Sequence, residues 1–167
     1  MRIFYTLLFM LLRRSGRRSI KCKNKVKNLK SELPTSIKKI NNYKKTLKFT
    51  KSPQTIIKNF ANIKEEISKI LAYNKDIQLE LDGEIINSME DIQKIQNRYI
   101  KEFINNQINI ELEKEQEVTS LFLKESLIKK ALNQALKSIE YIPKDVEMRL
   151  RITELEEKLL KCYEGKS

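Results

Sequence analysis

The chain has 167 residues, a formal net charge of +12 and no histidine. Its three glycines and three prolines argue against a turn-rich all-β fold, while 40% hydrophobic content is enough for one core. Without histidine, Ser-His and Cys-His nucleophile pairs are excluded, and the scattered glycines exclude a phosphate-binding loop. The totals therefore predict a mainly α-helical, non-enzymatic protein, for which no cofactor is expected.

The positive charge is concentrated in the first third of the chain. Residues 1–62 hold 17 lysines and arginines against the single acid Glu32, whereas residues 63–167 hold 17 bases against 21 acids. Such asymmetry is typical of a polyanion-binding extension joined to a folded body. We expect three parts: a targeting-like or anchor segment (1–20), a basic arm (21–51) and a helical domain (52–167). The expected fold is a helical hairpin or small helical bundle with a basic, extended N-terminal arm.

The N-terminal segment combines an apolar run with arginines. Ile3 to Leu12 is almost entirely apolar, and ten residues are too few for a bilayer span, which needs about 20. Arginines and serines follow, and no acid occurs before Glu32, as in organelle-targeting segments. The segment favours mitochondrial localisation. A plastid-type organelle, a membrane-surface contact through residues 3–12 and an ordinary structural N-terminus remain alternatives.

The basic arm carries lysines at short intervals, with Tyr43 and Phe49 among them. Pro34 is expected to interrupt any long helix, so the arm is expected to be extended or only locally helical. Lysines bind phosphates without sequence preference, and the aromatic rings can stack on unpaired bases. The alternatives are a solvated tail and an anionic membrane surface. The candidate RNA-contacting residues are Arg13, Arg14, Arg17, Arg18, Lys21, Lys23, Lys25, Lys27, Lys38, Lys39, Lys44, Lys45 and Lys48.

Two local patterns follow the arm. Ser52-Pro53 predicts a helix start, and apolar residues at spacings of four and three predict a core helix that ends at Asn74. That stripe consists of Ile56, Phe60, Ile63, Ile67 and Ile70. Alternation through residues 77–86, broken by Asp82-Gly83, predicts a short β-hairpin, with a loop between two helices as the alternative. Ser88 and Asp91 then resemble a capping box.

The stretch 107–118 is ambiguous. Its apolar stripe fades into Glu111, Glu113, Glu115 and Glu117, whose mutual repulsion weakens a helix. A kinked helix, a loop and a short strand all remain open. Because the chain has no histidine, we interpret the carboxylates as a solvated face and expect no metal site.

Two further amphipathic helices are predicted on either side of Ile142-Pro143, with Pro143 in the first turn of the second helix. Ile128, Leu132, Ala135, Ile139 and Ile142 form the first stripe. The candidate protein-interface residues of the second stripe are Met148, Ile152, Leu155 and Leu159. Packing within the domain and a coiled-coil seam against a partner are both open.

These features favour a non-catalytic structural subunit of a large organellar assembly, most of all a mitochondrial ribosomal protein. Residues 13–51 would contact rRNA or another polyanion, and the helical body would contact neighbouring proteins. The alternatives are an accessory subunit of a mitochondrial respiratory-chain or ATP synthase membrane complex, and a surface helical adaptor. If the chain is divided into a basic arm and a helical body, charge reversal at Lys44 and Lys45 should leave folding intact. Ile139→Asp should destabilise the body by several kcal/mol.

Overall fold

The computed structural model describes residues 20–73 and 77–165, with side chains for residues 33–72 and 77–165. The apolar segment Ile3–Leu12 lies outside the described residues. The described elements are α2 (Ile20–Leu47), α3 (Pro53–Tyr73), β1 (Leu79–Leu81), β2 (Glu84–Ile86), α4 (Met89–Glu117), α5 (Leu121–Tyr141) and α6 (Val146–Glu164). The prediction of a mainly helical protein with a short β-hairpin is confirmed.

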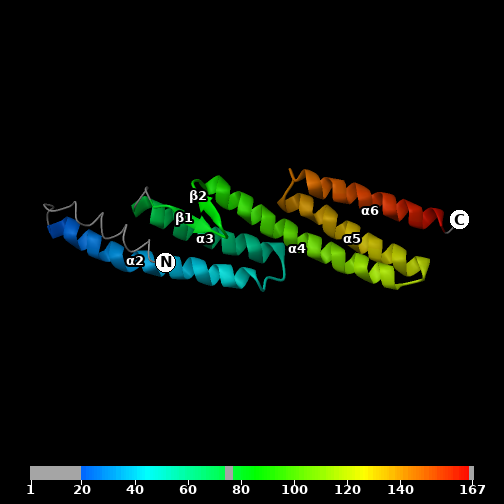
Figure 1. Ribbon diagram of the computed structural model, residues 1–167, viewed down its shortest axis with the longest axis horizontal. Helices are drawn as coiled ribbons and strands as arrows, with labels where there is room; N and C mark the ends of the chain where they lie inside the picture. Colours follow the sequence, from blue (N-terminus) through cyan, green and yellow to red (C-terminus); the bar gives the residue numbers. More distant parts are fainter. Residues whose placement is uncertain (1–19, 74–76, 166–167) are drawn as a thin grey trace.

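Each helix runs back along the one before it, which gives an elongated molecule (Figure 1). Helices α2 and α3 lie at one end with the hairpin, and α5 and α6 lie at the other. The long helix α4 extends from the first group into the second. Buried side chains from α2 to α6 and from both strands form one hydrophobic core, so the two ends share a single packed interior.

Helix α3 follows its sequence pattern closely. Its predicted stripe is fully buried, and no member is more than 2% exposed. At its start, the Ser52 hydroxyl accepts a hydrogen bond from the Thr55 backbone N–H, and Pro53 occupies the first helical position. Local sequence therefore predicted both the start and the buried face of this helix.

The hairpin is antiparallel, and Leu81 pairs with Glu84 across the turn. Asp82 and Gly83 have φ values of 53° and 82°, both in the left-handed region that a two-residue type I′ turn requires. Leu81 and Ile86 are buried. The capping box also forms, because the Ser88 side chain accepts from the Asp91 N–H and the Asp91 carboxylate accepts from the Ser88 N–H.

The ambiguous stretch is helical, since α4 continues without interruption to Glu117 and ends at Val118. Two lysines relieve the repulsion among its glutamates. Lys114 lies 3.1 Å from Glu111, and Lys158 of α6 lies 2.7 Å from Glu115. Glu115 is only 7% exposed, so the interpretation of this run as a solvated face is wrong at that position.

Helix α5 buries most of its predicted stripe, because Ile128 and Ile142 are 1% and 4% exposed and Leu132 packs against the core. Ala131, Ala135 and Ser138 are completely buried, whereas Ile139 is 36% exposed. Small residues on its inward face let α5 lie close to both α4 and α6. The expectation that Ile139 belongs to the core is therefore wrong.

Two prolines differ from their predicted roles. Pro34 lies inside α2 and does not interrupt it. Burial of Leu33 and Ile37 against the core offsets the roughly 3 kcal/mol that an interior proline costs. Pro143 lies in the turn before α6, which begins at Val146 with Asp145 as its N-cap.

Candidate nucleic-acid interface

The structure describes only part of the predicted RNA-contacting set. Arg13, Arg14, Arg17 and Arg18 lie outside the described residues. Lys21, Lys23, Lys25 and Lys27 belong to α2, but their side chains are not described. The described members are Lys38, Lys39, Lys44 and Lys45 on the second half of α2, and Lys48 directly after its end.

One face of α2 is held against the body by apolar packing. Leu47 is 4% exposed, and the half-buried Ile37, Ile40 and Tyr43 pack against the same core. The second half of the basic arm is thus a helix with a fixed orientation, where the sequence favoured an extended or locally helical segment. The fixed face decides which lysines point to solvent.

Lys39 is half exposed, but its ammonium group pairs with a buried carboxylate of the body. Its ammonium lies 3.2 Å from Glu66, which is 5% exposed and also lies 3.1 Å from Lys69. The Ser36 hydroxyl donates a 2.7 Å hydrogen bond to the second oxygen of Glu66. That bond, opposed by burial and assisted by the two lysines, lowers the pKa of Glu66 to about 2.

Lys44 faces the body. Its ammonium lies 2.8 Å from the carboxylate of Asp82 in the hairpin turn, and the Tyr99 hydroxyl donates to the other oxygen of that carboxylate. Burial opposes ionisation of Asp82, but these two contacts outweigh it and lower the pKa of the carboxyl group. Burial and the same hydrogen bond raise the pKa of Tyr99. The hairpin thus positions α2 through its turn.

The remaining described lysines of the predicted set are exposed. Lys38 and Lys45 are seven residues apart, which places them on one side of α2, away from the buried Leu47, and Lys48 follows directly after the end of the helix. Among the described residues none of the three has an acidic partner within 4.0 Å. We call these three residues the lysine face.

The chain segment that carries the lysine face is basic and includes an exposed aromatic ring. Residues 33–64 contain eight lysines and no acid. Phe49 follows directly after Lys48 and is 81% exposed, whereas Tyr43 packs against the core. Of the two aromatic residues in the arm, Phe49 alone has a ring open to solvent.

The predicted protein-interface residues lie elsewhere. Met148, Ile152 and Leu155 are 2%, 7% and 2% exposed and belong to the core, and Leu159 is half-buried. This stripe therefore packs inside the chain and does not present a free seam to a partner. Ionic contacts add to that packing: Lys101 of α4 pairs with Asp145 and Glu147 at the start of α6.

Sequence reasoning missed the residues that position the lysine face, namely Ser36, Glu66 and Asp82. Each acts through a partner 17 to 38 positions away, and no short motif signals such a pair. The described residues contain no cluster of three potential metal ligands. None of the described helices is both long and apolar enough to cross a bilayer. Comparisons with protein-family models, curated proteins and solved structures found no match to this chain.

Proposed function

We propose that the protein is a non-catalytic structural subunit of a large organellar assembly, a mitochondrial ribosomal protein whose helix α2 contacts rRNA. The observation that carries the proposal is the lysine face. Its three lysines are exposed and lack described acidic partners, while Lys39 and Lys44 are used to hold α2 in place. A fixed row of ammonium groups can follow a phosphate backbone without rearranging, which supports sequence-independent binding.

A second candidate is an accessory subunit of a mitochondrial membrane complex. Large apolar side chains are exposed at the end of the body where α5 begins and α6 ends. Phe122 is 72% exposed, Leu123 49% and Leu160 61%. Exposed apolar surface of this kind supports docking against another protein subunit. The same surface would serve the ribosomal proposal by binding a neighbouring protein.

Sedimentation of the tagged protein from gently lysed organelles tests the proposal. Co-migration with a ribosomal particle, abolished by RNase and by about 0.5 M salt, is the expected result because salt screens phosphate contacts. Migration that RNase leaves unchanged and only detergent disrupts would replace the ribosomal proposal with the membrane-complex candidate.

The lysine face can be tested directly by replacing Lys38, Lys45 and Lys48 with glutamine. Because about 0.7 counterions are released per phosphate contact on single strands, the slope of log affinity against log salt should fall by about 2. The matched control replaces Lys130, Lys144 and Lys161, which are exposed lysines of α5, α6 and the turn between them. Equal losses of RNA affinity in the two triple variants would contradict a specific role for α2.

A further inference from the structure

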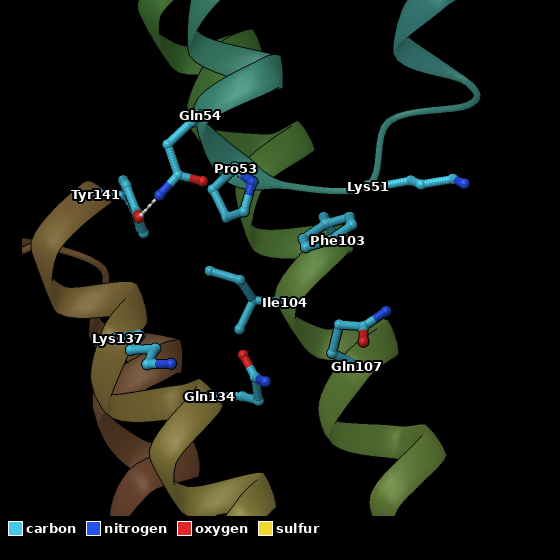
Figure 2. Close-up of a pocket in the computed structure, with 9 residues that line it drawn as sticks. All are labelled: Lys51, Pro53, Gln54, Phe103, Ile104, Gln107, Gln134, Lys137 and Tyr141. Carbon is cyan, nitrogen blue, oxygen red and sulfur yellow. Dashed lines mark hydrogen bonds between the residues drawn. The ribbon is translucent and has the colours of Figure 1, made fainter.

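A pocket of about 230 Å³ opens beside the turn that joins α2 to α3. It lies between the start of α3, the middle of α4 and the end of α5 (Figure 2). Ile104 of α4 points into it, and Pro53 and Gln54 border it at the start of α3. The volume exceeds the roughly 150 Å³ of an engineered cavity that holds benzene, so one aromatic heterocycle can enter.

The pocket wall is rich in groups that hydrogen-bond to a heterocycle. Gln54, Gln107 and Gln134 contribute three amides, each with donors and an acceptor. Gln54 donates to the hydroxyl of Tyr141, which fixes one side of the pocket. In the part of the chain that the structure describes, the side chains of Gln107 and Gln134 have no hydrogen-bond partner.

The charge and ring content of the wall point to the same ligand class. The lining contains Lys51 and Lys137 and no carboxylate. Gln134 points into the space between α4 and α5, Lys137 lies along α5, and Lys51 extends outward from the edge of the pocket (Figure 2). Phe103 and Tyr141 add two half-buried rings. Amides, rings and ammonium groups together match a base with its phosphate.

The position of the pocket connects it to the lysine face. Lys48, Phe49 and Lys51 belong to the turn between α2 and α3, and Lys51 already lines the pocket. Lys51 is only three residues after Lys48 in the chain. An RNA strand bound along the lysine face would therefore pass next to the pocket. Phe49, being 81% exposed, is available to stack on a neighbouring base at that point.

We propose that this pocket receives the base of one unpaired nucleotide in the RNA bound by α2. Gln107 and Gln134 hydrogen-bond to the edge of the base, and Lys51 and Lys137 neutralise its flanking phosphates. The inference rests on the proposed function and narrows it, because the preferred ligand becomes an RNA with a bulge or loop and not a continuous duplex.

The test uses the full-length protein and two RNA hairpins that differ only by a single-nucleotide bulge, which carries 2-aminopurine as a fluorescent base. Wild type should bind the bulged hairpin about tenfold more tightly, and the fluorescence of the bulge should change on binding. The variant Q134L/K137Q should lose this preference while its duplex affinity changes by only about twofold. The control N133L/K130Q, on the same helix with exposed residues, should retain the preference.

The outcomes separate the two proposals. If both hairpins bind equally and lose affinity when the lysine face is neutralised, the pocket inference is overturned while the proposed function stands. Equal loss of preference in the pocket variant and its control also overturns the inference. If wild type binds neither hairpin, both the pocket inference and the proposed RNA-binding function are overturned. Lys137→Gln alone, at an exposed position, provides a second variant in case Q134L/K137Q does not fold.

Discussion

Ser36 and Glu66 lie 30 positions apart, yet the Ser36 hydroxyl donates a 2.7 Å hydrogen bond to the buried Glu66 carboxylate. This contact joins α2 to α3 and holds the basic helix against the body. Because the Ser36 hydroxyl is buried and its acceptor is charged, the bond contributes more than an exposed neutral one. The orientation of the lysine face therefore depends on a side-chain pair outside it.

Replacing Ser36 with alanine should lower the free energy of unfolding by about 1.5 to 3 kcal/mol, since it removes a hydrogen bond to a charged group. Urea denaturation with a linear extrapolation measures the change. Ser68→Ala is the control, because its hydroxyl bonds only to the Lys64 carbonyl on an exposed side of α3. Equal effects of the two substitutions would show that the Ser36–Glu66 hydrogen bond contributes no more to the free energy of unfolding than an exposed one.

The low pKa of Glu66 makes the stability of the protein depend on pH. Folding lowers this pKa from 4.5 to about 2, so the stabilising contribution is complete above about pH 4.5. It is lost as the pH falls through 2, where the native carboxylate is protonated. The difference in unfolding free energy between wild type and Glu66→Gln should therefore shrink between pH 5 and pH 2.

Lys44 and Lys45 are adjacent in sequence but should behave differently on charge reversal. Lys44→Glu places a second carboxylate against Asp82 and should destabilise the protein by about 1 to 3 kcal/mol. Lys45→Glu changes an exposed residue and should leave the midpoint of thermal unfolding nearly unchanged. This replaces the sequence-based expectation that both changes leave folding intact. RNA affinity measured on the folded Lys45→Glu protein should fall.

The inward face of α5 can be tested with two aspartates. Ala135→Asp buries an unpaired charge at a site with no exposure and should cost several kcal/mol or abolish folding. Ile139→Asp should cost about 1 kcal/mol, because 36% exposure lets the carboxylate reach water. Circular dichroism during denaturation distinguishes the two. A larger loss for Ile139→Asp would contradict the greater burial of Ala135.

The ion pair between Glu115 and Lys158 connects α4 to α6. Lys158→Met keeps the apolar stem but leaves the buried Glu115 carboxylate without its partner, which should cost about 1 to 3 kcal/mol. Adding Glu115→Leu should restore most of that loss, because an apolar pair can replace a buried ion pair at little net cost. A double variant no more stable than Lys158→Met would argue against this account.

The sequence by itself determined the features that depend on near neighbours. The α3 stripe, the Asp82-Gly83 turn and the Ser88–Asp91 capping box each depend on residues one to four positions apart. Helical periodicity, turn dihedral angles and cap hydrogen bonds are local, so short segments predict them reliably.

Only the tertiary structure decided the rest. Whether Pro34 breaks a helix depended on how much apolar surface α2 buries against α3. Whether Glu115 is solvated, and whether Lys44 is available to RNA, depended on partners 43 and 38 positions away. Ile139 is 36% exposed although Ile128 and Ile142 of the same stripe are buried, because the contacts of α5 with α4 and α6 decide which side chains are covered. Local periodicity carries no information about the placement of distant segments, so their contacts decided which residues are buried, paired or free.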